Sequence, residues 1–241
     1  MFRLRTNVFA ILFFLHTAFW VIACLVVSPL GQKAVQRSVY RWVRGHYWLA
    51  NHLLGVTTRV EGAIPPGAYL IAVKHQSMYE TMEIARFCDT PIMVMKQELD
   101  RVPLFGLVTR LYGVIAVDRE AGSKAVRYLV AEGQKAAREK RPIVIFPEGT
   151  RVPAGTAPPL RSGFYALYRS LGLPVVPVAM DSGRLFGKII PTAPGVVTFR
   201  VGEVIPAGLP RKEAEVRVYA GINALEPAAR SAIESAAQAR P

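Results

Sequence analysis

The chain has 241 residues, of which 51% are hydrophobic, and it carries a formal net charge of +13. This length holds one α/β domain with an appendage, and the apolar content is high for a fully soluble domain. Residues 1–60 contain seven Lys and Arg and no acidic residue, a pattern that favours an anionic membrane surface as partner. No zinc-finger spacing, RNP motif or helix-turn-helix pattern accompanies this charge, so we expect no nucleic-acid partner.

Metal and disulfide chemistry find little support in the sequence. The two cysteines, Cys24 and Cys88, form neither a disulfide framework nor a metal-binding spacing, and they fit a reducing compartment. The four histidines include no His-Glu-x-x-His pattern, and GRLFGK at residues 183–188 falls short of the phosphate-loop spacing. We therefore expect neither a metal nor a cofactor.

The N-terminal segment predicts two consecutive helices. Residues 8–30 form an almost unbroken apolar run that is long enough to cross a bilayer or to lie in one leaflet. A cleaved signal peptide fits less well, because the run is longer than usual and no Ala-x-Ala site precedes Pro29. After the break SPLG, apolar residues recur at helical spacing over residues 33–54 with arginines between them. This favours an amphipathic helix at the membrane surface, with a soluble helix packed on the domain as the alternative.

We accordingly predict two parts, a membrane-associated helical hairpin at residues 1–55 and an α/β domain at residues 56–241. More basic residues follow the apolar run than precede it. By the positive-inside rule, the domain is expected to face the cytoplasm from the inner membrane.

Beyond residue 57, apolar runs with strand character alternate with helical patterns. The expected strands are residues 68–73, 91–95, 114–117, 143–146, 175–179 and 197–202, and the expected helices are residues 79–87, 104–111, 123–139, 163–171 and 210–237. This alternation predicts an α/β fold with a largely parallel or mixed sheet flanked by helices.

The sequence KHQSMYE at residues 74–80 is the strongest chemical signal. It places His75 at the end of a buried strand, where open α/β sheets carry their sites, and a carboxylate, Glu80, five residues later. A histidine oriented by a carboxylate serves as a general base. Ser77 and Glu80 also match a capping box at a helix N-terminus, and the two roles are partly compatible.

Three further segments place polar residues after apolar strands, namely MKQEL at 95–99, GVIAVDR at 113–119 and FPEGTR at 146–151. With KHQSMYE, they resemble in order and content the glycerophosphate acyltransferase family, whose first motif is His-x4-Asp and whose third is Phe-Pro-Glu-Gly-Thr. The likeness covers about residues 57–181 and includes VVPVA at 175–179 as the fourth motif. One departure is that Glu80 stands where the motif has Asp, a longer arm that still offers a carboxylate.

The resemblance implies transfer of an acyl chain from acyl-CoA or acyl-carrier protein to the sn-2 hydroxyl of 1-acylglycerol-3-phosphate (lysophosphatidic acid), without an acyl-enzyme. It implies His75 and Glu80 as catalytic residues. It also implies an acceptor-binding group, in which the basic residues are phosphate ligands unless they are only solvated charges. That group comprises Lys96, Gly113, Arg119, Glu148, Gly149, Thr150 and Arg151.

Other functions are weighed against this hypothesis. A serine hydrolase would need a Gly-x-Ser-x-Gly elbow, and Ser162 and Ser182 lack its flanking glycines. An acyltransferase for another lysolipid, such as a lyso-aminolipid, stays open because the acceptor headgroup depends on loop geometry. A membrane scaffold without activity is the alternative from a different class.

Overall fold

The computed structural model describes residues 2–187 and 190–227. A seven-stranded sheet lies at its centre in the order β1-β7-β6-β2-β5-β3-β4. Neighbouring strands are parallel except for β6 and β7, so the predicted mixed α/β sheet is confirmed. The strands are β1 (Val56–Glu61), β2 (Leu70–Val73), β3 (Ile92–Lys96), β4 (Ile115–Val117), β5 (Ile143–Ile145), β6 (Val175–Met180) and β7 (Gly195–Val201).

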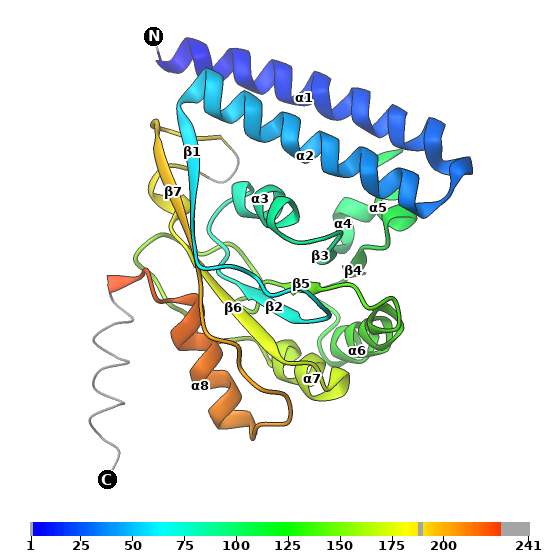
Figure 1. The fold of residues 1–241 in the computed structure, drawn as a ribbon, viewed down its shortest axis with the longest axis vertical. Coiled ribbons are helices and arrows are strands. Elements are labelled where there is room, and N and C mark those ends of the chain that lie inside the picture. The colour runs from blue at the N-terminus through cyan, green and yellow to red at the C-terminus, as the bar shows by residue number, and fades with distance from the viewer. Residues whose placement is uncertain (1, 188–189, 228–241) are drawn as a thin grey trace.

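Helices cover both faces of the sheet, as Figure 1 shows, with α1 to α5 on one side and α6 to α8 on the other. The helices are α1 (Phe2–Val27), α2 (Gln32–Leu54), α3 (Tyr79–Phe87), α4 (Gln97–Asp100), α5 (Phe105–Tyr112), α6 (Ser123–Ala137), α7 (Ser162–Leu171) and α8 (Arg211–Ile222). Two short 3-10 helices add to these, η1 (Ser28–Leu30) and η2 (Ser182–Arg184).

The core follows from the two-residue period of the strands. In β2, Ile71 and Val73 belong to the apolar cluster beneath the hairpin and α3, whereas Leu70 and Ala72 belong to the cluster beneath α6, α7 and α8. All four side chains are fully buried, which explains why this strand is apolar without interruption. The sheet therefore separates two cores and holds the ends of its central strands in fixed positions.

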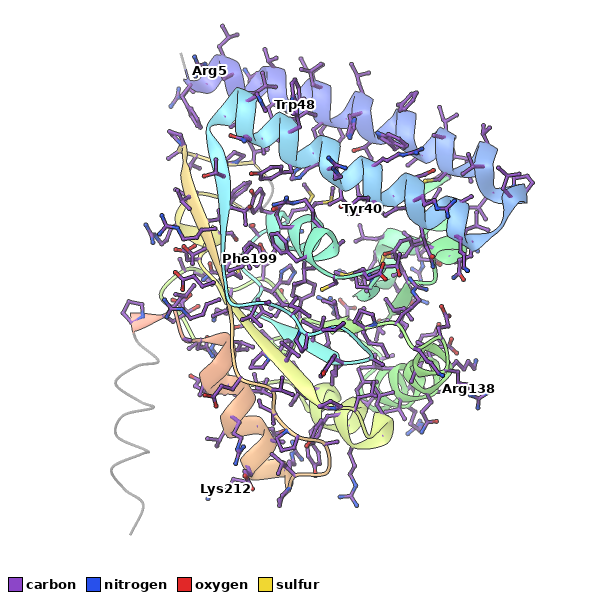
Figure 2. All side chains as sticks on the ribbon, viewed as in Figure 1. Arg5, Tyr40, Trp48, Arg138, Phe199 and Lys212 are labelled. Carbon is purple, nitrogen blue, oxygen red and sulfur yellow. The ribbon has the colours of Figure 1, made fainter. Side chains whose placement is uncertain are left out.

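The N-terminal hairpin packs against the domain along α2. Within the hairpin, α1 and α2 are joined by polar contacts: the His16 imidazole lies 3.0 Å from the Trp42 carbonyl oxygen, and the Trp42 indole donates to the Thr17 hydroxyl at 3.1 Å. Phe9, Phe13 and other hairpin side chains share one core cluster with the sheet. Figure 2 shows side chains projecting outward along α1. The exposed large apolar side chains of this helix are Leu4, Val8, Ile11, Leu12, Phe14, Leu15, Phe19, Ile22 and Val26.

By length and composition, the helical segment Phe2–Leu30 is apolar enough to cross a membrane, with a mean hydropathy of 2.5 in its best window. Only 11% of that window is buried inside the protein. The segment therefore presents far more apolar surface than the core uses.

Two sequence expectations differ from the structure. Strand β1 was missed, because Thr57, Thr58 and Arg59 interrupt the apolar pattern of this edge strand. The helix expected over residues 210–237 ends at Ile222, where the Asn223 side chain donates to the Tyr219 carbonyl at 2.9 Å and stops the helical repeat. Residues 228–237 of that prediction lie outside the described residues.

Candidate active site

The polar motifs meet at one edge of the sheet. In the order β6, β2, β5, β3, these four strands end in the segments that carry Ser182, His75, Glu148 and Lys96. The carboxyl ends of parallel strands point to the same edge, so residues far apart in the chain become neighbours there: Gln76 Oε1 accepts the N–H of Gly183, 107 positions away, at 2.8 Å.

His75 is held through its backbone and its ring. Its N–H donates to Glu148 Oε2 at 3.0 Å, and its carbonyl accepts the Val152 N–H at 2.8 Å. The ring stacks on Phe146 with centroids 4.2 Å apart, and Nδ1 lies 2.9 Å from Glu80 Oε1. Since Nδ1 is engaged, Nε2 is the ring nitrogen left for a substrate.

The Glu80 carboxylate is fully buried and accepts five hydrogen bonds. Oε1 accepts from His75 Nδ1 and from the N–H groups of Gln76 (2.5 Å) and Ser77 (2.6 Å). Oε2 accepts from the hydroxyls of Ser77 (2.7 Å) and Ser182 (2.8 Å). Burial raises the pKa of Glu80. The hydrogen bond and charge of His75 and the two Ser77 hydrogen bonds together lower it by more than burial raises it, so the pKa lies below its ordinary value.

The Glu80 carboxylate makes both the helix-capping contact and the contact with the histidine. Ser77 Oγ accepts the Tyr79 N–H at 3.0 Å where α3 begins, and Glu80 reaches back to the Ser77 N–H. The longer arm of Glu80 therefore contacts both the first turn of α3 and the imidazole.

Glu148 lies behind His75 rather than in the open part of the site. Its side chain is fully buried, with Oε1 accepting from the Lys74 ammonium at 2.7 Å and Oε2 accepting the His75 N–H. Burial raises the pKa of Glu148, and the Lys74 charge and hydrogen bond oppose that rise. This carboxylate thus contacts the backbone of His75, while Glu80 contacts its ring.

A cavity of about 700 Å³ opens beside His75. Its walls are mostly apolar and come from both hairpin helices, α3, α5 and β3, and include Phe13, Trp20, Trp42, Met82 and Val108. At the end that His75 lines, the cavity also meets Thr150 and three cationic residues, Lys96, Arg119 and Arg151. An apolar chain with an anionic polar end matches this distribution of side chains.

The three cationic residues differ in their partners. Lys96 forms an ion pair with Glu98 at 2.7 Å, with both side chains about half exposed (47% and 48%). Arg119 Nη1 donates to the Gly149 carbonyl oxygen. Arg151 is half-buried and makes no hydrogen bond or ion pair with any residue from 2–187 or 190–227. Of the three, Arg151 has the most bonding capacity left for a ligand.

The two glycines of the expected acceptor group have conformational roles. Gly149 has φ +73°, and a Cβ there would lie 2.9 Å from Arg161 Cγ. Gly113 has φ +96° and ends α5, away from the cavity lining, whereas its neighbour Val114 lines the cavity. Thr150 lines the cavity and is exposed.

Sequence reasoning missed Lys74, Gln76, Ser182, Asn223 and Glu226, all of which the structure brings to this edge. Lys74 and Gln76 flank His75 in the quoted motif, so their position was a usable signal. Asn223 and Glu226 follow α8 and carried no pattern. No group of three or more His, Cys, Asp or Glu that could hold a metal is found in the described ranges.

Comparisons with known proteins identify the family of the chain. The acyltransferase family model matches residues 56–181, which span β1 to the end of β6 and contain every motif described above. A 1-acyl-sn-glycerol-3-phosphate acyltransferase of Pseudomonas aeruginosa is 33% identical over 77% of this chain and 74% of its own length. The human 1-acyl-sn-glycerol-3-phosphate acyltransferase alpha is 29% identical over 69% of this chain and 59% of its own length.

The fold has a counterpart among solved structures. The crystal structure of the 1-acyl-sn-glycerophosphate (LPA) acyltransferase from Thermotoga maritima superposes with a TM-score of 0.73, covering 100% of this chain and 99% of that chain at 22% identity. This likeness includes the N-terminal hairpin and supports the fold, while the family model and the Pseudomonas relative establish descent. The chain therefore belongs to the acyltransferase family that includes the 1-acyl-sn-glycerol-3-phosphate acyltransferases.

Proposed function

We propose that the protein transfers an acyl chain from an acyl thioester, either acyl-CoA or acyl-carrier protein, to the sn-2 hydroxyl of 1-acylglycerol-3-phosphate and yields phosphatidic acid. The observation that carries this proposal is the His75–Glu80 pair, 2.9 Å apart, at the cationic end of an otherwise apolar cavity. The identity of the acceptor is inferred from the names of the related acyltransferases.

In this mechanism His75 acts as general base. Its Nε2 takes the proton of the acceptor hydroxyl while the hydroxyl oxygen attacks the thioester carbonyl carbon. The tetrahedral intermediate collapses, the carbon–sulfur bond breaks, and the imidazolium returns the proton to the departing thiolate. Glu80 fixes the tautomer with the proton on Nδ1 and stabilises the imidazolium. The substrate hydroxyl is the nucleophile, so no acyl-enzyme forms.

Acceptor binding is assigned to the cationic end of the cavity. Arg151 is the proposed main phosphate ligand, because its guanidinium lines the cavity and is not used by its neighbours in the described chain. A guanidinium can hold phosphate through two parallel hydrogen bonds. Arg119, Lys96 and Thr150 line the same end, Gly149 shapes the loop that carries Thr150, and Gly113 ends α5 before β4. The apolar walls would contact acyl chains.

The hairpin is the proposed membrane anchor, with α1 lying in the plane of one leaflet. Contacts near both ends of α1 support this arrangement: Phe9 packs on His46 of α2, and Cys24 shares a buried cluster with Val35. A helix attached to the domain along its length presents only its outer face to lipid. Lys33, Arg37, Arg41 and Arg44 on α2 are exposed and add attraction to anionic headgroups.

A lysolipid panel assayed with both donors tests the activity. Parent protein should acylate lysophosphatidic acid, and His75→Ala should turn over about 10²–10⁴ times more slowly, the range that general-base catalysis supplies. A folded His75→Ala variant within a few-fold of the parent would remove His75 from the mechanism, and an inactive parent would favour the scaffold alternative. A parent that prefers a phosphate-free acceptor would favour the lyso-aminolipid alternative.

Membrane attachment is tested by attempting to extract the protein from anionic vesicles. Exposed charges are screened by salt, whereas buried apolar surface is not, so 1 M salt should leave most of the protein bound and detergent should release it. Complete release by salt would contradict insertion of the apolar face of α1. Orientation toward the cytoplasm is tested by protease access from either side of inverted and right-side-out vesicles.

A further inference from the structure

We propose that the turn at residues 223–226, which follows α8, is a positioning element for His75 and acts through both chain neighbours of that residue. The inference deepens the proposed function and rests on His75 as its base. The turn lies about 150 residues downstream of the motif and beyond the segment that the family model matches, yet its side chains reach Lys74 and Gln76.

Lys74 is the first of these neighbours, and its side chain is completely buried. An ammonium has three donors, and here each has an acceptor: Glu148 Oε1 at 2.7 Å, the Thr156 carbonyl oxygen at 2.7 Å and Asn223 Oδ1 at 2.6 Å. Removal of the Asn223 oxygen would leave one donor of a buried cation unpaired, which is costly in a water-free environment.

The Lys74 ammonium is connected to the His75 backbone by one residue. Glu148 accepts Lys74 on Oε1 and the His75 N–H on Oε2, so a shift of the ammonium moves the carboxylate that holds His75. Asn223 in turn is fixed by its own helix, because its Nδ2 donates to the Tyr219 carbonyl at 2.9 Å. An unbroken chain of hydrogen bonds therefore runs from the end of α8 to the backbone of the proposed base.

Gln76 is the second neighbour, and Glu226 holds it. Gln76 Nε2 donates to Glu226 Oε1, and Glu226 Oε2 accepts the Gly155 N–H at 2.7 Å. Gln76 Oε1 accepts the Gly183 N–H at 2.8 Å. Glu226 is 3% exposed. The turn thus contacts the loops that follow β2 and β5, and Gln76 extends the connection to the loop that follows β6. His75 lies between the two points of attachment, Lys74 and Gln76.

This arrangement predicts an effect on the chemical step rather than on substrate binding. None of Lys74, Gln76, Asn223 and Glu226 lines the cavity, so no substrate contact is lost when the turn is altered. A displacement of a reacting group by about 1 Å can cost about 10² in rate. Loss of an attachment should therefore lower kcat and leave KM nearly unchanged.

The test compares Asn223→Ala and Glu226→Gln with Glu215→Gln as matched control. Glu215 lies on α8 in an exposed pair with Arg211 and should leave activity unchanged. Asn223→Ala and Glu226→Gln should lower kcat about 10- to 100-fold with KM within about threefold of the parent. Asn223→Asp, which restores an oxygen opposite Lys74, should recover kcat to within about fivefold of the parent.

A second readout does not depend on turnover. The His75 ring resonances in 13C-labelled protein, assigned by their loss in His75→Ala, should shift or broaden in Asn223→Ala and stay in place in Glu215→Gln. If kcat and the resonances are both unchanged in folded Asn223→Ala, the inference is overturned. It is also overturned if the loss of kcat matches the unfolded fraction seen by circular dichroism. An active His75→Ala variant would instead refute the proposed function, and the ring resonances would still decide the role of the turn.

Discussion

The two polar regions at the carboxyl edge of the sheet differ in how completely the protein satisfies them. Beside His75, both carboxylate oxygens of Glu80 have donors within 2.9 Å, and all of these partners are buried. At the cationic end of the cavity, Arg119 and Arg151 are only partly buried or exposed, and Arg151 has no partner in the described residues. The hydrogen-bonding groups around His75 and Glu80 are therefore satisfied by the protein itself, whereas the cationic end of the cavity keeps donors available for a ligand.

This difference separates two tasks. A group that must accept a proton at a fixed position needs its orientation determined before substrate arrives, because reorganisation during the reaction would add to the barrier. A group that recognises an incoming phosphate needs free donors, because the ligand supplies the acceptors. Substitutions in the first region should therefore change kcat, and substitutions in the second should change kcat/KM for phosphate-bearing acceptors.

Glu80→Gln is expected to have the largest effect of the changes considered next. An amide cannot stabilise an imidazolium, so kcat should fall by about 10², within the contribution of general-base catalysis. The amide also turns an NH2 group toward donors that now bond to the carboxylate, which should lower the free energy of unfolding by about 1–3 kcal/mol. Steady-state kinetics and denaturant unfolding in detergent measure the two losses separately.

Ser182→Ala is the matched control for Glu80→Gln. It removes one donor from Glu80 Oε2 and leaves the Oε1 contact with His75 in place. Stability should decrease by about 1 kcal/mol, while kcat stays within a few-fold of the parent. If Ser182→Ala and Glu80→Gln lose kcat equally, the carboxylate acts only through packing of the loop, and its support of the imidazolium must be abandoned.

Arg151→Ala tests the second region. Loss of a charge-assisted contact to phosphate costs roughly 1.5–3 kcal/mol, so kcat/KM for lysophosphatidic acid should fall by about one to two orders of magnitude. Saturation by the thioester donor should change much less, because the proposed contact is to the acceptor. Competition between two acceptors in one reaction gives the ratio of their kcat/KM values directly.

Two controls accompany Arg151→Ala. Arg138→Ala removes an equal charge from the exposed end of α6 (Figure 2), does not alter the cavity lining, and should leave kcat/KM unchanged. A lysolipid without a phosphate monoester should show no difference between parent and Arg151→Ala. Equal losses on both acceptors would assign Arg151 to structure or to the chemical step.

The acid stability of the first region follows from the pKa of Glu80. The pKa in the folded state lies below the ordinary value of 4.5, so the ionised carboxylate stabilises the fold. That stabilisation is complete above the unfolded value and is lost as pH falls through the folded one. Gln cannot titrate, so the stability difference between parent and Glu80→Gln should be constant near pH 6–7 and should shrink only below about pH 4.5. A difference that shrinks already near neutral pH would show that the Glu80 carboxylate does not control this pH dependence.

The fold was largely predictable because its signals are local. Buried strands such as β2, β5 and β6 are continuous apolar runs, and β2, β3, β4 and β5 are each followed by a helix. Strand β1 escaped notice because it lies at the sheet edge, where only Val56 is fully buried and the polar residues Thr58 and Arg59 are tolerated. An edge strand gains its place from its partner β7, which lies about 140 residues away in the chain and leaves no local pattern.

Site residues were predictable where the chemistry requires a fixed spacing in the sequence. They were not predictable where only the packing of distant elements brings them together. His75 and Glu80 are five residues apart and turned out to lie 2.9 Å apart. By contrast, Ser182 and Asn223 reach the site only because β6 and α8 pack beside β2. A serine or an asparagine at a distant position carries no sign of its partner in the sequence.

Lys96→Ala is expected to have the smallest effect, because Lys96 combines features of both regions. It lines the cationic end of the cavity, yet its ammonium is already paired with Glu98 at 2.7 Å. An exposed ion pair is weak, so kcat/KM for lysophosphatidic acid should fall by no more than about fivefold. Glu98→Gln would free the ammonium for a ligand and should raise kcat/KM by a similar factor. A tenfold or larger loss in Lys96→Ala, with no gain in Glu98→Gln, would mean that phosphate displaces Glu98 and that Lys96 shares the ligand with Arg151.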